Sequence, residues 1–288
     1  MRSSENLKVY EHEIPVGSRL YVGKSAELKR KIERLASEIL VENGFSEIVS
    51  PYFSYHQHLS VSPTQLLRFS DSLNHEVSLR ADSTVDVVRI VKARLKNTAS
   101  NRWFYIQPVF RYPSTEIYQI GAEIIGESKL RQSINIVKNI FKNFEISPTL
   151  QISNIEIPIT IAKILNIDIG LFERIQIEQI LSLNIEWLNK LALLSSVDEL
   201  KEAIEISPKE LQKPLNRLLE LAQGVEYANV SIVALYYSKM RYYDKLFFRF
   251  IDQNSILSGG GSYEIDGEIS SGFAIYTDAL IDKIKQEG

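Results

Sequence analysis

The sequence predicts an α+β domain in which an antiparallel sheet packs against amphipathic helices. The first observation is the stretch Trp103–Gly126, in which two β-rich runs, 103–112 and 116–125, flank a three-residue loop. That arrangement is typical of a β-hairpin. The second observation is that residues with helical periodicity recur both before and after this stretch. Strands and helices of this kind pack in layers around one core.

Apolar residues at helical spacing predict four helices outside the middle of the chain. Ser25 is the expected N-cap of the first helix, and Gly44 is its expected C-terminal stop. Asp82 or Ser83 is the expected cap of the second. The four helices are expected over residues 25–44, 83–96, 130–144 and from about 277 onward.

Short β-rich runs predict further strands on both sides of the hairpin. These strands are expected at residues 45–55, 76–80, 230–238, 242–251 and 273–275. The first is expected to bend or break at Pro51. The glycines at 259–261 predict a tight turn at which the backbone approaches another group closely. They lack the lysine and following helix of a phosphate-binding loop.

Residues 150–225 differ in composition from the rest of the chain. Isoleucine, leucine and asparagine dominate there, and the periodicity is helical. The run Ser207-Pro208-Lys209-Glu210 matches a capping box with proline at the first helical position. We therefore expect one domain over residues 1–288, with a helical insertion at 150–225.

Composition and charge limit the classes of function open to the chain. It has 288 residues, 44% hydrophobic, with a net charge of −3, and so no basic field for nucleic acid. The absence of cysteine excludes disulfides and thiolate catalysis and fits a reducing cytoplasm. There is no signal-peptide core and no apolar run long enough to span a membrane. We expect a cytoplasmic protein without a cofactor, and without a metal site because His56 and His58 have no third ligand nearby.

Polar side chains share one face of the predicted hairpin. Alternation places Gln107 and Arg111 on one face of the first strand, and Gln119, Gly121 and Glu123 on one face of the second. Gln119 and Glu123 are then about 13 Å apart along the strand, and Gly121 leaves an empty place between them. If these faces align, Arg111, Gln119 and Glu123 ring a hole about the size of an amino acid. A solvated polar face of an ordinary sheet is the alternative, although buried charges must be paired or bound.

The residues do not predict a catalytic site. All four histidines precede residue 76, away from the predicted pocket. Glu123 and Asp82 could act together in acid–base chemistry or could hold the amine of a ligand, and we favour the second interpretation. The residues alone thus predict an α+β domain with a zwitterion-sized polar pocket.

An ordered set of motifs resembles the class II aminoacyl-tRNA synthetases, and the histidyl type in particular. The runs FYIQPVFRY and EIYQIGAEIIG resemble motif 2, and NGFSEIVSPYF resembles motif 1, through which class II enzymes dimerise. LRADSTVDVVR, YYDKLFFRF, SGGGSYE and GFAIYTDAL are similar to histidine-specific segments and motif 3. The resemblance covers most of the chain except 150–225, and it implies a class II synthetase-like antiparallel sheet flanked by helices.

The same resemblance implies a histidine-binding pocket. The residues at the matching positions are Asp82, Thr84, Arg111, Gln119, Glu123, Tyr243 and Tyr263. Asp82 and Thr84 would contact the amino group and Arg111 the carboxylate. Gln119 and Glu123 would hold the amine and ring side, and the two tyrosines the imidazole. These pairings are chemically reasonable, since carboxylates suit an ammonium group and a guanidinium suits a carboxylate.

The departures from the synthetase pattern concern ATP and tRNA. Ser238 stands at the position of the family's catalytic arginine, with Arg241 three residues away, and Ala279 stands at the position of the motif 3 arginine. The motif 2 loop is reduced to residues 113–115, and Gln107 replaces a glycine. Loss of two cations that stabilise the transferring nucleotide should abolish adenylation. We also expect no anticodon-binding domain.

A surviving amino-acid pocket without the ATP and tRNA machinery resembles the regulatory subunit of ATP phosphoribosyltransferase. That family acts with the short form of the catalytic subunit at the first step of histidine biosynthesis. The resemblance implies a non-catalytic subunit that activates this partner and takes part in histidine feedback. It also implies a homodimer, formed through residues 45–55, within a hetero-oligomer. Two alternatives stay open: a divergent synthetase-like enzyme that activates an amino acid for an unusual acceptor, and a dimeric scaffold.

Overall fold

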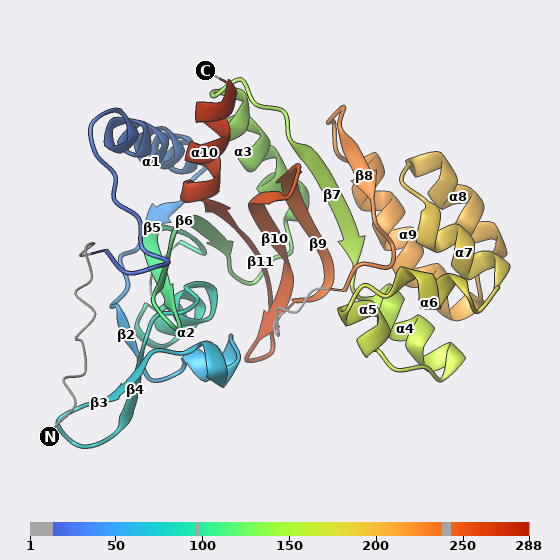
Figure 1. The fold of residues 1–288 in the computed structure, drawn as a ribbon, viewed down its shortest axis with the longest axis horizontal. Helices are drawn as coiled ribbons and strands as arrows, with labels where there is room; N and C mark the ends of the chain where they lie inside the picture. The colour runs from blue at the N-terminus through green and yellow to red at the C-terminus, as the bar shows by residue number, and fades with distance from the viewer. Residues whose placement is uncertain (1–13, 96–97, 99, 238–242, 288) are drawn as a thin grey trace, which may run out of the picture.

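The computed structural model describes residues 14–95, 98, 100–237 and 243–287. An eight-stranded sheet lies at its centre (Figure 1), in the order β1-β5-β6-β11-β10-β9-β7-β8. The strands are β1 (Ser46–Glu47), β5 (Arg102–Arg111), β6 (Thr115–Ile124), β7 (Thr149–Asn154), β8 (Val230–Ile232), β9 (Tyr243–Asp252), β10 (Ser255–Ile265) and β11 (Glu268–Tyr276). The pairs from β5 to β7 are antiparallel, and a short parallel strand closes each edge. The predicted α+β class with an antiparallel sheet is confirmed.

Four helices cover the two faces of this sheet. They are α1 (Lys24–Glu42), α2 (Thr84–Arg94), α3 (Leu130–Lys142) and α10 (Thr277–Glu287). Helices α1, α3 and α10 lie side by side on one face, as Figure 1 shows. The valines of α2 pack against Trp103, Tyr105 and Tyr263 on the opposite face. The second face is therefore only partly closed by apolar packing, and the polar pocket lies on it.

The predicted strand over residues 45–55 is divided between two sheets. Its first part is β1, and its second part, β2 (Phe53–Ser54), joins β4 (Glu76–Leu79) and β3 (Arg68–Ser70) in a small sheet. The break lies at Pro51, which has no backbone N–H to donate. The Arg80 guanidinium fixes the break, because it donates to the carbonyl oxygens of Ser50 at 2.8 Å and of Pro51 at 3.0 Å.

Six helices follow β7 and form a lobe beside the β7–β8 edge of the sheet (Figure 1). They are α4 (Glu156–Leu165), α5 (Gly170–Glu173), α6 (Ile177–Leu181), α7 (Glu186–Leu193), α8 (Val197–Ile206) and α9 (Lys209–Gln223). Residues 150–154, which we expected to be part of the helical insertion, are a strand instead. Leu150 and Ile152 are buried on one face of that strand, in the period-two pattern of a sheet.

Two predicted helix caps are wrong. Ser207 ends α8, where its hydroxyl donates to the Ala203 carbonyl, and so it does not cap α9. The capping box of this segment is formed by Ser196 and Glu199 at the start of α8. Ser25 lies inside the first turn of α1, and Gly23 is at the N-cap position. The Ser25 hydroxyl bonds the backbone N–H and carbonyl of Val22 instead of capping the helix.

The glycines at 259–261 lie in the middle of β10, paired with β9 and β11, and do not form the predicted turn. The expected close approach is present, because a Cβ on Gly260 would overlap the Gly272 carbonyl and the Phe248 ring. Strand pairing on both sides satisfies the backbone polar groups, so the glycines can stay extended.

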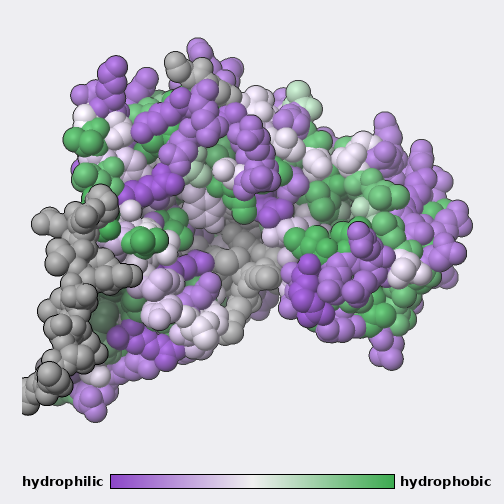
Figure 2. All heavy atoms as spheres, viewed as in Figure 1, coloured by the Kyte–Doolittle hydropathy of each residue, from purple (hydrophilic) through white to green (hydrophobic). Residues whose placement is uncertain are grey.

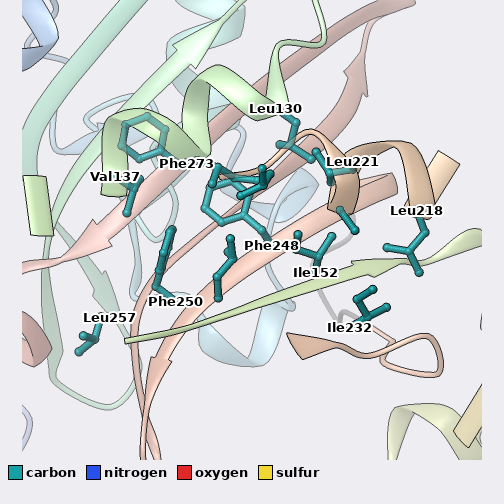
Figure 3. Close-up of a cluster of buried hydrophobic side chains, with 14 of the residues drawn as sticks. Leu130, Val137, Ile152, Leu218, Leu221, Ile232, Phe248, Phe250, Leu257 and Phe273 are labelled. Atoms are coloured by element: carbon teal, nitrogen blue, oxygen red, sulfur yellow. The ribbon is translucent and has the colours of Figure 1, made fainter. Parts of the chain in front are cut away.

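The main core joins the helical lobe to the sheet. Figure 3 shows side chains of α3 and α9 gathered against those of the central strands. Its labelled members are Leu130, Val137, Ile152, Leu218, Leu221, Ile232, Phe248, Phe250, Leu257 and Phe273. On the face in view, Figure 2 shows hydrophilic side chains with hydrophobic groups between them. Among the described residues, no helix has the length and apolar character needed to cross a membrane.

Candidate ligand-binding pocket

A cavity of about 320 Å³ lies over the central strands, on the face that α2 leaves open. Six of the seven residues at the predicted histidine positions line it: Asp82, Thr84, Arg111, Gln119, Glu123 and Tyr263. The seventh, Tyr243, is the first residue of β9, and its backbone pairs with Tyr263. The Tyr243 side chain, like Ser238 and Arg241, lies outside what the structure describes.

Small residues on β10 and β11 make room for this cavity. Gly259, Gly260, Gly272 and Ala274 line it from these two neighbouring strands. A Cβ on Gly272 would overlap the carboxyl group of Glu123. Glycine is therefore required at 272 for the Glu123 side chain to lie where it does.

The empty place expected above Gly121 is filled. Tyr105 pairs with Gly121 across the hairpin, and its ring occupies the space that a Cβ at position 121 would need. The glycine thus admits a tyrosine, whose hydroxyl then reaches Glu123 Oε1 at 3.1 Å. Tyr105, Gln119 and Glu123 all line the cavity, which also extends over residues of β11 and β10.

Gln107 is not among the residues that line the cavity. Its amide nitrogen donates to the hydroxyl groups of Ser50 at 2.9 Å and of Ser83 at 3.3 Å. Its oxygen accepts from the Ser50 backbone N–H at 3.3 Å. Gln107 therefore ties the segment before β2 to the start of α2.

Glu123 lines the pocket and is fully buried. The hydroxyl groups of Tyr105 and Tyr263 donate to its two carboxyl oxygens, the second at 2.7 Å. Burial raises the pKa of Glu123 to about 8, against these hydrogen bonds and together with the negative charge of Asp82. At neutral pH the carboxyl group of the empty pocket is thus mostly protonated, and it can ionise when a cation arrives.

Asp82 lies beside Glu123 at the start of α2. The side-chain oxygen of Gln57 accepts from the backbone N–H groups of Ala81 and Asp82, both at 2.7 Å, and its nitrogen donates to the Asp82 carbonyl at 3.0 Å. The Asp82 carboxylate accepts from the Val85 N–H at 3.4 Å, at a helix N-terminus that favours negative charge. Asp82 and Glu123 make one end of the pocket suited to an ammonium group.

Arg111 supplies positive charge to the same cavity. Its Nε donates to the Ala81 carbonyl at 3.3 Å, and it forms no ion pair within the described part of the chain. Carboxyl groups and a guanidinium therefore line one cavity, an arrangement that suits the opposite charges of an amino acid.

Several lining residues were not predicted from the sequence, among them Glu173, Tyr236, Arg249 and Tyr276. Glu173 reaches the cavity from α5, which shows that the helical segment contributes to its wall. Arg249 could have been predicted to lie in the site, because it is a single charge inside the apolar run of β9. A charge in a buried strand must be paired or bound to a ligand.

The arrangement suits binding better than nucleotide chemistry. At the motif 3 position, Ala279 lies in α10 and packs against the main core, so it offers no charge to a phosphate. Within the described residues, no group of three or more metal-binding side chains is present. What the cavity offers is a set of complementary charges for a small zwitterion.

Comparison with protein families and curated proteins gives two consistent findings. Residues 20–280 match the family model described as histidyl-tRNA synthetase. The chain is 44% identical to the ATP phosphoribosyltransferase regulatory subunit of Wolinella succinogenes, over 96% of this chain and 97% of that protein. It is 39% identical to the protein of the same name from Helicobacter hepaticus, over 95% and 98% of the two chains.

Solved structures show the same fold. A Bacillus halodurans protein described as an ATP phosphoribosyltransferase regulatory subunit/histidyl-tRNA synthetase superposes with a TM-score of 0.84 at 21% identity, over 96% of this chain and 84% of that one. The apo histidyl-tRNA synthetase of S. aureus gives a TM-score of 0.64 at 19% identity, over 96% and 74%. The expected class II synthetase-like fold is confirmed.

Proposed function

The chain belongs to the family of ATP phosphoribosyltransferase regulatory subunits, and we propose that it activates the short catalytic subunit of that enzyme and takes part in feedback inhibition by histidine. In this role it is a non-catalytic subunit at the first step of histidine biosynthesis. It acts in the cytoplasm with its catalytic partner, as a homodimer within a hetero-oligomer.

The observation that carries the proposal is the pocket with opposite charges. Arg111 forms no ion pair among the described residues and can meet a carboxylate, while Asp82 and Glu123 supply carboxyl groups that suit an ammonium group. Gln119 and Tyr263 complete the wall with neutral polar groups that suit an imidazole ring. A histidine molecule carries a chemical counterpart for each of these groups, and the end product of a pathway is a suitable signal for its first enzyme.

A route from this pocket to a partner surface runs through Gln57. The residue bonds the backbone of Asp82 and donates to the Asp86 carboxylate at 2.6 Å, while Ser54 of β2 donates to the same carboxylate at 3.0 Å. A ligand that moves Asp82 would therefore act on the segment carrying β2. Such coupling requires that the ligand bind two states of the assembly with different affinity.

Histidine titration by calorimetry tests the pocket. We expect saturable binding to the wild-type protein. Removing one charged partner of the ligand, in Arg111→Gln or Glu123→Gln, should cost about 2 kcal/mol or more, which is about 30-fold in Kd. Arg34→Gln, on an exposed side chain of α1, should bind like the wild type. Folded protein that gives no heat with histidine would remove the sensor from the proposal.

Mixing with the short catalytic subunit of the same organism tests the regulatory role. We expect a complex on size exclusion, a rise in phosphoribosyl-ATP formation, and inhibition by histidine that Arg111→Gln weakens. Unchanged activity together with separate elution of the two proteins would contradict the proposal.

A divergent amino-acid-activating enzyme is the second candidate, favoured by the survival of Arg111 at the motif 2 position. Its chemistry would require stabilisation of phosphate charge, to which Ala279 contributes nothing. We therefore expect no histidine-dependent exchange of pyrophosphate into ATP. Exchange above background that disappears in Arg111→Ala would favour the enzyme instead.

A further inference from the structure

Arg249 is a second guanidinium of the pocket, distant in sequence from the first. It lies in the middle of β9, between Gln151 on β7 and Gly259 on β10. Its strand neighbours Phe248 and Phe250 face the main core, so alternation turns Arg249 to the pocket face. The absence of a side chain on Gly259 leaves the space beside the arginine open to the cavity.

The contacts of Arg249 orient its guanidinium without neutralising it. One terminal nitrogen donates to Gln151 Oε1 at 2.6 Å, and the Tyr236 ring centre lies 3.8 Å from the guanidinium carbon. Its Nε is buried and forms no hydrogen bond within the described part of the chain, where it also has no ion pair. Both partners are neutral groups, so they orient the guanidinium without compensating its charge. Among the described residues, the Nε–H has no acceptor.

Arg249 and Arg111 line the same cavity, and the charge of each acts on the Tyr276 hydroxyl. Burial raises the pKa of the Tyr276 hydroxyl, and the positive charges of Arg111 and Arg249 both act against that rise. Tyr276 pairs with Gln119 across the sheet and lines the cavity with both arginines. Two guanidiniums that have no carboxylate partner among the described residues therefore line the same cavity as this hydroxyl group.

An uncompensated charge in a partly buried site is unfavourable, and a bound counter-ion offsets that cost. Burial lowers the pKa of Arg249, yet an arginine stays protonated in proteins, so the charge persists. The planar guanidinium fork matches the geometry of carboxylate and phosphate oxygens. A neutral acceptor could accept from the buried Nε–H but would leave the charge uncompensated.

We propose that the Arg249 end of the pocket is a subsite for an oxyanion, the phosphate or carboxylate group of a small metabolite, distinct from the amino-acid site at Asp82 and Glu123. The pocket then responds to two ligands, or to one ligand longer than a single amino acid. The subsite rests on the contacts of Arg249, whichever amino acid occupies the other end.

Anion titration of the purified full chain tests this subsite. Inorganic phosphate and acetate are titrated separately by calorimetry, at constant ionic strength set with chloride. We expect saturable binding of at least one of the two anions to the wild-type protein. Binding should weaken at least tenfold in Arg249→Gln and by less in Arg249→Lys, which keeps the charge but loses the fork. Arg34→Gln should leave it unchanged, because that side chain is exposed on α1.

The two probes distinguish the sources of the oxyanion. Saturable phosphate binding supports a phosphorylated metabolite, and acetate binding alone supports a carboxylate. If neither anion binds the folded wild-type protein, or if Arg249→Gln binds it equally well, the subsite is wrong. Should Arg249→Gln fail to fold, the wild-type titration and Gln151→Leu, which removes the orienting acceptor, still decide the question.

A parallel histidine titration separates this inference from the proposed function. Loss of anion binding in Arg249→Gln with histidine binding intact supports two subsites. Anion binding without any histidine binding would contradict the histidine sensor and leave the subsite standing.

Discussion

Glu123 shows how one residue can be unfavourable in the empty protein and useful with a ligand. Its carboxyl group has no contact with bulk water, and ionising it there is opposed by burial and by Asp82. The hydroxyl groups of Tyr105 and Tyr263 offset only part of that cost. An arriving ammonium group would supply the missing counter-charge, so binding near neutral pH should release a proton.

The stability of the ligand-free protein should therefore depend on Glu123 and pH. The folded-state pKa of about 8 lies above the ordinary value of 4.5, so the folded protein holds this proton more tightly than the unfolded chain. The contribution of this bound proton to the stability of the folded protein is fully present below the ordinary pKa. It is lost as pH rises from that value to the folded-state pKa. Relative to Glu123→Gln, the wild type should lose unfolding free energy with a slope of up to about 1.4 kcal/mol per pH unit.

Urea unfolding at several pH values between 5 and 8 measures this slope. Glu38→Gln, an exposed glutamate on α1, is the matched control and should follow the wild type. Parallel curves for the wild type and Glu123→Gln across this window would show that Glu123 is ionised in the folded protein.

At the scale of elements, the helical segment is part of the main core. Leu218 and Leu221 of α9 pack with Ile152 of β7 and Phe248 of β9 (Figure 3), and α5 contributes to the pocket wall. The segment thus depends on the sheet for burial of its apolar face. We infer that helices and sheet unfold together.

Truncating the shared core should lower the stability of the whole protein. Leu218 is fully buried, so Leu218→Ala should cost about 2–5 kcal/mol. Leu193 is 70% exposed at the end of α7, and Leu193→Ala should change stability by no more than about 0.5 kcal/mol. Urea unfolding with circular dichroism measures both.

The two tryptophans report separately on the two parts, because Trp103 lies in β5 and Trp187 in α7. Variants that keep only one of them should show coincident fluorescence transitions. Separate transitions would mean that the helical segment folds on its own core, contrary to the shared packing.

At the scale of the whole molecule, the small sheet presents aromatic side chains to the surface. Tyr52, Phe53 and Tyr55 are each more than half exposed, and the ring of Phe53 meets that of Phe69 at 5.7 Å. Exposed apolar groups gathered in one place mark a contact surface. The motif 1 resemblance of this segment indicates a second copy of the chain as the partner.

We accordingly predict a homodimer at micromolar concentration, to be measured by sedimentation velocity. Phe53→Glu should yield a folded monomer, because burying an unpaired carboxylate in an interface is costly. Leu193→Glu introduces the same charge on the helical lobe and should remain dimeric. A monomeric wild-type protein would contradict the motif 1 interpretation and leave the aromatic surface for another partner.

The sequence by itself determined what depends on near neighbours. Period-two alternation placed the β5–β6 hairpin, and periodicity near 3.6 placed the long helices, because both patterns follow from local backbone geometry. The ordered motifs led to the family and to six residues that the fold brings around one cavity. Short-range signals also misled, at Ser207 and in the glycines of 259–261, where several local structures satisfy the same residues.

Only the tertiary structure decided how strands distant in the sequence meet. Tyr105 fills the space above Gly121, and Arg249 reaches the pocket across the glycine-containing strand from a part of the chain far from Arg111. These outcomes follow from register and from the size of side chains on neighbouring strands, which no local pattern encodes. The charges of the pocket were therefore readable from the chain, while its volume and its second arginine arose from close packing across the sheet.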